Sequence, residues 1–291
     1  MTNELIMLEN ERIRNVLIPS DGGRLLSFVD KRSGRDYIWT NKRTESILRY
    51  YGANYDDLSA GGVEEAFPTG LADELIGDKL PFFGELWSVP WLVRKQTKTF
   101  VEMERYSSIY PILVTKTYSL EDRTLYCSYS LENEGPTEIP YLFGVHPSLQ
   151  IASGDVLRLP EQEYRVGTAV NVPDALNKTF RWPLLNERAL SVIEADGTSG
   201  ECLEFRSNSV SEGCIGLSDG NTEFRVGFDA AFFPALSVWL IYGGWRGHYC
   251  VMTEFFSGWP FTLSEAVTHG AYTKIKPGEL IDTSVTYRLM A

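Results

Sequence analysis

The chain has 291 residues, and 43% of them are hydrophobic, which is enough to form one large core. Its 39 acidic residues outnumber its 27 basic residues, the formal net charge is -12, and Lys and Arg do not cluster along it. This charge argues against nucleic acid and against an anionic membrane surface as partners.

Short runs in which apolar and polar side chains alternate are spread along the chain, with Gly, Asn, Asp or Pro between most of them. In chain order they predict strands over residues 12–18, 25–29, 101–105, 115–120, 125–131, 202–206, 224–228, 236–242, 249–254 and 284–289. The segment 121–123 joins two of these strands into a hairpin. Helical periodicity is scarce, and the two short helical candidates are residues 42–50 and 72–80.

This succession of strands, without alternating helices, predicts an all-β protein built as a large antiparallel β-sandwich. The sequence contains no internal repeat, low-complexity tract or linker that would divide it. We therefore expect residues 1–291 to form a single domain.

Two further features concern the compartment of the protein. Residues 1–12 carry charges where a signal peptide needs an apolar stretch, and the apolar stretch 230–242 is interrupted and too short to span a bilayer. The four cysteines are spaced too widely for a CxxC motif, so we expect buried thiols of a reducing cytoplasm; they are Cys127, Cys202, Cys214 and Cys250. We expect a cytoplasmic protein outside the membrane.

Two residues a hundred positions apart are candidates for acid/base chemistry. His146 precedes Pro147, and Glu254 lies in an apolar run where an unpaired carboxylate would be costly. An imidazole and a carboxylate that face one pocket can move a proton from one oxygen to another near neutral pH. The alternatives are a histidine of the core and a carboxylate in a structural ion pair.

Segments along nearly the whole chain resemble, in their order, the aldose 1-epimerase or galactose mutarotase-like family. They are Asp-Gly-Gly-Arg-Leu-Leu-Ser-Phe at 21–28, Gly-Arg-Asp-Tyr-Ile-Trp at 34–39, the strands at 118–120 and 127–133, Pro-Tyr-Leu-Phe-Gly-Val-His-Pro at 140–147, Phe-Pro-Ala-Leu-Ser-Val-Trp at 233–239, Glu254, and Lys-Pro-Gly-Glu at 276–279. The resemblance implies the galactose mutarotase-like supersandwich with an open groove.

It also implies a sugar-ring reaction that needs no cofactor. An acid donates a proton to the ring oxygen while a base removes the proton of the anomeric hydroxyl, the ring opens, and reclosure after rotation gives the other anomer. By position in the family, His146 is the acid and Glu254 the base, and we expect their polar atoms to lie about 5 to 8 Å apart.

The sequence departs from the sugar mutarotases at two places. Their second active-site histidine aligns with Phe83, and the region of their glycine-arginine substrate motif reads Gly-Gly-Val-Glu-Glu-Ala-Phe-Pro-Thr at residues 61–69. These departures point to a sugar other than free galactose or glucose.

Further residues are candidates for binding a small carbohydrate. Acidic side chains near aromatic residues and glycines can accept hydrogen bonds from sugar hydroxyls, and tryptophans can stack on a sugar face. The candidates are Glu64, Glu65, Glu85, Trp87, Trp91 and Trp259. Solvated glutamates and core tryptophans are the alternatives.

Other functions remain open from the sequence. One is a carbohydrate-binding protein without turnover, and another is a glycoside hydrolase or lyase that uses Glu254 with Glu65 or Glu85. A sugar-phosphate 1-epimerase would need arginines at the groove, for which the candidates are Arg49, Arg94 and Arg246. The three histidines lack the spacing of a zinc site, so we expect no metal, and His248 and His269 are interpreted as surface or structural residues.

Overall fold

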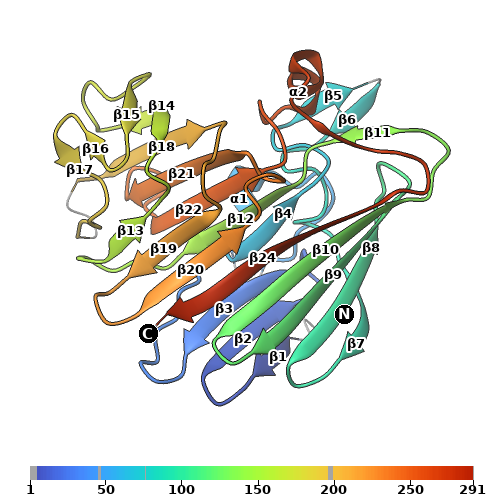
Figure 1. Cartoon of the computed structure of the whole chain (residues 1–291), viewed down its shortest axis with the longest axis horizontal. Coiled ribbons are helices and arrows are strands. Elements are labelled where there is room, and N and C mark those ends of the chain that lie inside the picture. Colours follow the sequence, from blue (N-terminus) through green and yellow to red (C-terminus); the bar gives the residue numbers. More distant parts are fainter. Residues whose placement is uncertain (1–4, 45–46, 76, 196–198, 291) are drawn as a thin grey trace.

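A computed structural model describes residues 5–44, 47–75, 77–195 and 199–290. Two large antiparallel sheets pack face to face, and strands from all parts of the chain contribute to them (Figure 1). This is the predicted all-β sandwich. Among the described residues, no helix is long and apolar enough to cross a membrane.

The larger sheet has twelve strands. Their spatial order is β1 (Ile6–Glu9), β2 (Ile13–Ile18), β3 (Arg24–Asp30), β4 (Val63–Ala66), β12 (Gly144–Leu149), β22 (Tyr249–Phe256), β21 (Ala235–Tyr242), β18 (Glu201–Ser207), β14 (Glu163–Val170), β15 (Thr179–Arg181), β16 (Leu184–Leu185) and β17 (Arg188–Ala189). Its central strands β4, β12, β22 and β21 are buried along nearly their whole length, because each of their faces is covered.

The smaller sheet has eight strands. Their order is β13 (Val156–Arg158), β19 (Cys214–Ser218), β20 (Glu223–Phe228), β24 (Leu280–Met290), β10 (Thr124–Asn133), β9 (Ile112–Glu121), β8 (Phe100–Tyr106) and β7 (Leu92–Gln96). Burial alternates along β9 and β10, so this sheet has one face on the core and one toward solvent.

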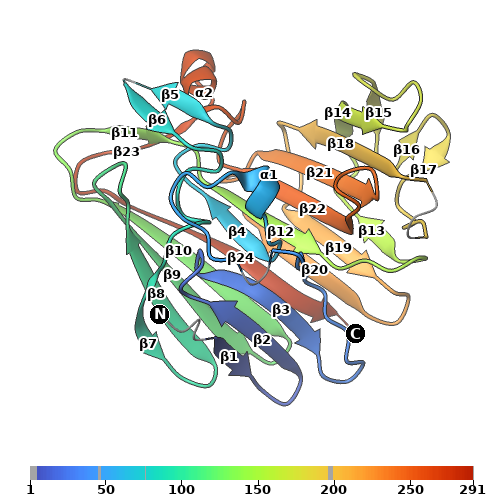
Figure 2. The same ribbon diagram turned by 180° about the vertical axis from the view of Figure 1, so that it is seen from behind.

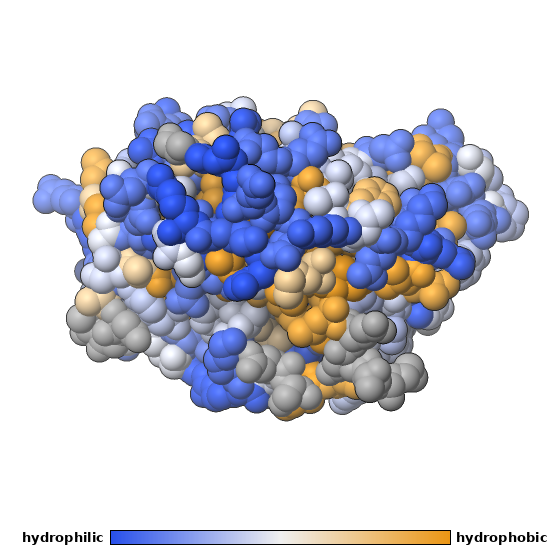
Figure 3. Space-filling model, turned by 90° about the horizontal axis from the view of Figure 1, so that it is seen from below, coloured by the Kyte–Doolittle hydropathy of each residue, from blue (hydrophilic) through white to orange (hydrophobic). Residues whose placement is uncertain are grey.

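The core lies between the two sheets and is rich in aromatic contacts. Phe28 of β3 packs on Phe224 of β20 with ring centroids 4.9 Å apart, and Phe255 of β22 stacks on Phe228 at 4.1 Å. Such pairs stabilise the sandwich beyond the burial of their area. Figure 3 shows the lower end of the molecule, where hydrophilic side chains cover most of the surface and hydrophobic ones gather in one area.

Six short elements complete the described part of the fold. Four are the strands of the small hairpin of β5 (Asp73–Leu75) and β6 (Asp78–Leu80) and of the pair of β11 (Ile139–Tyr141) and β23 (Thr273–Ile275). The others are the helices α1 (Tyr55–Leu58) and α2 (Leu263–His269). In Figure 2, α1 lies in front of β4 and β12, on the side of the larger sheet that faces away from the smaller one.

Each predicted strand is confirmed, with ends that shift by a few residues. The expected hairpin is β9–β10, closed at Asp122 with a positive φ of 45°. The cysteines of the described chain are free thiols; three are buried and Cys214 is half-buried.

Both helical candidates are wrong. The described residues of 42–50 form a turn at 42–44 and irregular chain beyond it. Side chains there bind backbone groups and so compete with helical hydrogen bonds: Asn41 accepts from the Arg43 N–H at 3.1 Å, and Thr44 donates to the Ser59 carbonyl at 2.7 Å. In the second candidate, 72–80, the described residues 73–75 and 78–80 form the β5–β6 hairpin, and Gly77 at φ 84° takes a conformation that other residues avoid.

Candidate active site

Three neighbouring strands of the larger sheet carry a row of titratable side chains. Glu64 of β4 lies opposite His146 of β12. The pairing of Ser148 with Met252 in the next ladder puts His146 opposite Glu254 of β22. Residues directly opposite each other share a face of the sheet and are close enough for their side chains to interact. The strand register therefore brings Glu64, His146 and Glu254 together.

The side chains of His146 and Glu254 lie within contact distance of each other. His146 Nε2 lies 3.5 Å from Glu254 Oε1, and the two residues are 2% and 9% exposed. This separation is shorter than the 5 to 8 Å that we expected. The shorter distance suits the chemistry better, because the ring oxygen and the anomeric oxygen of a sugar are bonded to the same carbon.

The other side of the His146 ring is held by α1. The Tyr55 hydroxyl donates to Glu64 Oε2 at 2.9 Å and lies 3.1 Å from His146 Nδ1. Since the single hydroxyl proton is directed to Glu64, the Tyr55 oxygen accepts from Nδ1–H. Asn54 starts the helix at this point by accepting the Asp57 N–H at 3.1 Å. Nδ1 therefore keeps its proton, and Nε2 faces Glu254.

A buried chain of charges lies behind this group. Arg24 donates to Glu64 Oε1 at 3.1 Å and also pairs with Asp21, which in turn pairs with Arg49. The five charged groups His146, Glu64, Arg24, Asp21 and Arg49 are all buried, so each depends on its neighbours for compensation.

The charges set the protonation of the site. Burial of His146 opposes its charged form, but hydrogen bonds and Coulomb attraction to Glu254 and Glu64 outweigh burial and raise its pKa to about 9. Burial also opposes ionisation of Glu64, yet His146, Arg24 and Arg49 hold the pKa of its carboxyl below the ordinary value. At neutral pH these shifts favour an imidazolium at His146 beside the Glu64 carboxylate.

His146 and Glu254 line a cavity of about 390 Å³ on this face of the larger sheet. The other polar side chains at its wall are Tyr55, Asp56 and Thr168. Most of the wall is apolar: Leu71, Phe82, Phe83, Val170, Cys202, Trp239, Ile241, Trp245 and Met252. A concave, mostly apolar space with a few converging polar groups is typical of a small-molecule site.

Phe83, which the sequence resemblance aligns with the second histidine of the sugar mutarotases, is part of this wall. Its ring centroid is 5.3 Å from that of His146, and its φ of 56° is uncommon for a residue with a side chain. The next residue, Gly84, packs so closely on the Phe67 carbonyl that a Cβ would lie 1.8 Å from its oxygen. The tight turn therefore aims an apolar ring at His146.

Two of the expected sugar-binding carboxylates lie elsewhere, which corrects their assignment to the cavity. Glu65 follows Glu64 along β4, so it points to the opposite face, where it accepts hydrogen bonds from Lys116 and Tyr129, each at 2.8 Å. Glu85 accepts from Ser107 and from the Ser108 N–H at 2.9 Å, and so orders that loop. Neither can serve as the second carboxylate of a hydrolase with Glu254.

The expected tryptophans also do not line the cavity. Trp87 is buried behind Tyr55, with ring centroids 5.1 Å apart, and Trp91 is buried under the Lys116 ammonium at 4.5 Å. Trp259 is half-buried beside the Arg206 guanidinium at 5.1 Å, in a neighbouring hollow. Their large apolar area is used in packing.

Trp239 and Trp245 occupy the wall instead. Trp239 lies in a predicted strand, on the face that carries Glu254. Because side chains alternate between the two faces of a strand, the sequence could have indicated its position at the cavity. Trp245 lies in the turn between β21 and β22 and has no such signal in the sequence.

Sequence reasoning also missed a carboxylate near Glu254. Glu204 of β18 is 3% exposed and accepts a hydrogen bond from the Ser237 hydroxyl at 3.0 Å. Burial and the charge of Glu254 raise the pKa of Glu204, and Arg206 opposes this rise. Glu204 is a candidate for the third carboxylate that the sequence did not identify.

The arginines proposed for a phosphate are engaged elsewhere. Arg49 belongs to the buried charge chain, Arg94 pairs with Glu104 on the smaller sheet, and Arg246 pairs with Asp57 at 3.1 Å. Among the described residues that line the cavity there is no Lys or Arg. His248 is buried, and burial with nearby arginines lowers its pKa to about 4, whereas His269 ends α2 at the surface.

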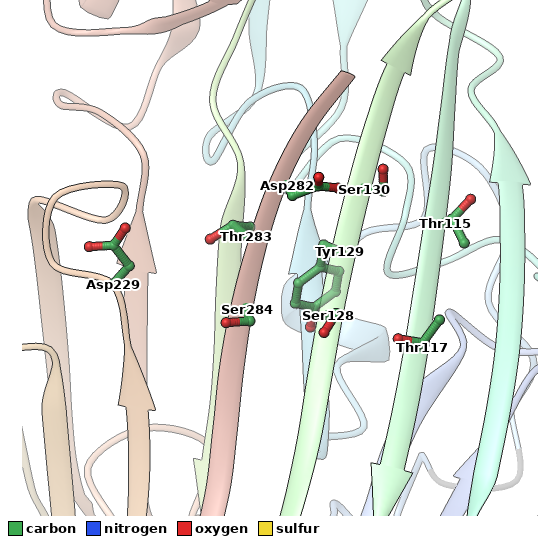
Figure 4. A pocket seen from close by; sticks show the side chains of 9 residues that line it. All are labelled: Thr115, Thr117, Ser128, Tyr129, Ser130, Asp229, Asp282, Thr283 and Ser284. Carbon is green, nitrogen blue, oxygen red and sulfur yellow. The ribbon is translucent and has the colours of Figure 1, made fainter. Parts of the chain in front are cut away.

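A second hollow, of about 490 Å³, lies at the smaller sheet (Figure 4). Hydroxyl side chains on β9, β10 and β24 line it together with Asp229 and Asp282. Its described lining contains no histidine, so it offers no acid/base pair like that of His146 and Glu254.

Comparisons with known proteins bear on the fold. A family model described as a domain of unknown function (DUF5107) matches residues 1–74. No curated protein matches the chain. Among solved structures, a galactose mutarotase-like protein from Lactobacillus casei is 16% identical with a TM-score of 0.71, over 99% of this chain and 100% of that one.

Two further solved structures are similar over nearly their whole length. A galactose mutarotase-like protein from Clostridium acetobutylicum is 14% identical with a TM-score of 0.72, over 98% of this chain and 95% of that one. The Slr1438 protein from Synechocystis is 16% identical with a TM-score of 0.74, over 99% and 96%. At these identities the likeness establishes the fold: the chain has the galactose mutarotase-like fold, as the sequence predicted.

Proposed function

We propose that this protein interconverts the anomers of a sugar, as an aldose 1-epimerase does, with His146 as the acid and Glu254 as the base. The observation that carries the proposal is the 3.5 Å separation of His146 Nε2 and Glu254 Oε1 at the wall of one cavity. The fold, which galactose mutarotase-like proteins share, supports it at a coarser level.

The proposed reaction begins with the sugar above this pair. The imidazolium donates its Nε2 proton to the ring oxygen while the Glu254 carboxylate takes the proton of the anomeric hydroxyl, so that the C1–ring oxygen bond breaks and an aldehyde forms. After rotation about C1–C2, the freed hydroxyl attacks the aldehyde carbon. It returns its proton to Nε2, and Glu254 returns its proton to the new anomeric oxygen.

Glu64 and Tyr55 are positioning residues in this proposal. They hold Nδ1–H throughout, so proton exchange is confined to Nε2. Glu64 also favours the imidazolium, which is the form that the first step requires.

The test is anomer exchange of free sugars measured by NMR or polarimetry. We expect exchange above the buffer rate for at least one sugar, and a loss of about 10² to 10⁴ in turnover for His146→Asn or Glu254→Gln with sugar binding retained, because each removes one positioned proton-transfer group. Exchange that neither substitution changes would contradict the assigned roles.

A second candidate is a carbohydrate-binding protein without turnover. The observation in its favour is Phe83, which stands where the family has its second histidine. Saturable sugar binding without any acceleration of anomer exchange would identify this function. The organisation of residues 1–291 as one domain and the cytoplasmic location stay predictions.

A further inference from the structure

The polar groups of the cavity are few and mostly engaged. The Tyr55 hydroxyl bridges Glu64 and His146, and His146 and Glu254 serve the two oxygens on the anomeric carbon. Thr168 and the exposed Asp56 are the other polar side chains on the described wall. The rest of the described wall is apolar and offers few partners for the hydroxyls of a bound hexose. Each buried hydroxyl left unpaired opposes binding.

The charges at the cavity wall argue against phosphorylated sugars as ligands. The described wall carries Glu254 and Asp56 but no Lys or Arg, and Arg246, next to Trp245 in sequence, is paired with Asp57. A phosphate group would enter beside carboxylates without a cation to compensate it. The one positive group, the His146 imidazolium, already lies between Glu254 and Glu64.

The aromatic rings of the apolar wall pack against neighbouring rings and lie close to the reacting pair. Trp245 is held edge-on against the buried His248 ring at 5.1 Å, and His248 in turn contacts Trp39 at 4.9 Å. On the other side, Phe83 packs on Tyr55 at 4.6 Å and on His146 at 5.3 Å. Such surfaces fit C–H groups and methyl groups, and they gain from removing those groups from water.

We infer that this site selects a neutral, hydroxyl-poor reducing sugar, of which a 6-deoxyhexose is the simplest example, over the parent hexose and over sugar phosphates. The inference rests on the proposed function for its catalytic part. In a 6-deoxyhexose a methyl group replaces the terminal CH₂OH, so one hydroxyl that needs a partner is exchanged for an apolar group that the wall can contact.

The experiment compares matched sugars that share the configuration at every ring carbon. In the gluco, galacto and manno series, anomer exchange is measured for the hexose, its 6-deoxy analogue and its 6-phosphate. In at least one series we expect kcat/KM for the 6-deoxy sugar to exceed that for the hexose by about 10-fold or more, the size typical of one unpaired buried hydroxyl, with no saturable exchange of the 6-phosphate. Equal rates for hexose and 6-deoxyhexose, or a preference for the phosphate, would overturn the inference and leave the proposed function standing.

A measurement of sugar binding tests the inference independently of catalysis. Methyl glycosides cannot exchange anomers, and their Kd is measured by tryptophan fluorescence, since Trp239 and Trp245 line the cavity. If no sugar is turned over, the proposed function fails, but tighter binding of the 6-deoxy glycoside would still support the inference. Equal binding of the two glycosides, or binding of neither, would refute it.

Phe83→His supplies a variant in which the apolar wall becomes polar beside His146. We expect the ratio of the two kcat/KM values, or of the two Kd values, to fall several-fold toward one, because the new imidazole can pair with a hydroxyl. Phe100→His on β8, which is outside the cavity, is the matched control and should keep the ratio. An unchanged ratio in a folded Phe83→His protein, verified by circular dichroism, would count against the inference.

Discussion

Replacement of Glu64 by Gln tests whether this buried carboxylate sets the protonation of His146. Glu64 Oε2 lies 3.6 Å from His146 Nδ1. At that distance and an effective dielectric constant of about 20, a unit charge pair is worth about 4 to 5 kcal/mol, which desolvation of both groups opposes. With both carboxylates present, the pKa of His146 is about 9 against an ordinary 6.5.

Loss of one of the two carboxylates should therefore lower this pKa by about one to two pH units. Arg24 acts in the same direction, because without the Glu64 charge its guanidinium opposes a second cation nearby. The amide keeps the size of the side chain, so packing changes little.

The assay is a pH titration of the His146 ring followed by ¹H–¹⁵N NMR, which does not depend on activity. The proposed function adds that the high-pH fall of anomer exchange, near pH 9 in the unchanged protein, moves down together with the titration. Glu65→Gln is the matched control, because Glu65 is equally buried in the same strand but points to the other face. An unchanged titration in Glu64→Gln, or an equal shift in Glu65→Gln, would refute the reasoning.

Two further predictions concern stability. Because folding raises the pKa of His146, its contribution to the free energy of unfolding is fully present below about pH 6.5 and is lost as the pH rises through about 9. This contribution amounts to about 3 kcal/mol. Urea unfolding at about pH 6 and about pH 10 should therefore show the loss in the unchanged protein and not in His146→Asn. Glu85→Ala should lower the free energy of unfolding by about 1 to 3 kcal/mol without changing sugar affinity, because the Ser108 N–H loses its acceptor; a change of affinity with intact stability would instead place Glu85 at the ligand.

The clearest strand predictions are those with one face on the core, although the fully buried β21 and β22 were also predicted. In β9 and β10, alternation of buried and exposed residues is visible in the sequence because solvent covers the other face. β4 has no such signal: its four residues are Val-Glu-Glu-Ala, and all four are buried. Its glutamates are stable there only because partners distant in sequence, Arg24 and Lys116, meet them in the folded chain.

The same contrast applies to the site. The proximity of His146 and Glu254 was predicted from the resemblance of the segments around them. Tyr55 was not predicted, because its contact with His146 depends on where a one-turn helix lies over the sheet, and local sequence does not encode that position. The adjacent Glu64 and Glu65 were indistinguishable in sequence, but the alternation of a strand sends them to opposite faces.

The row of Glu64, His146 and Glu254 on adjacent strands also shows how the larger sheet could position new functional groups in protein engineering. The backbones of adjacent strands are about 4.8 Å apart, so moving a functional group to the next strand shifts its backbone attachment by about that step, while the side-chain conformation sets the distance between polar atoms. Ser237 of β21 continues the row directly beside Glu254. A carboxylate introduced there would stand about one strand from Glu254, close to the spacing of about 5 to 5.5 Å that retaining glycosidases use. Relative to the proposed anomer exchange, one substitution on β21 would therefore add the carboxylate that cleavage of a glycosidic bond requires.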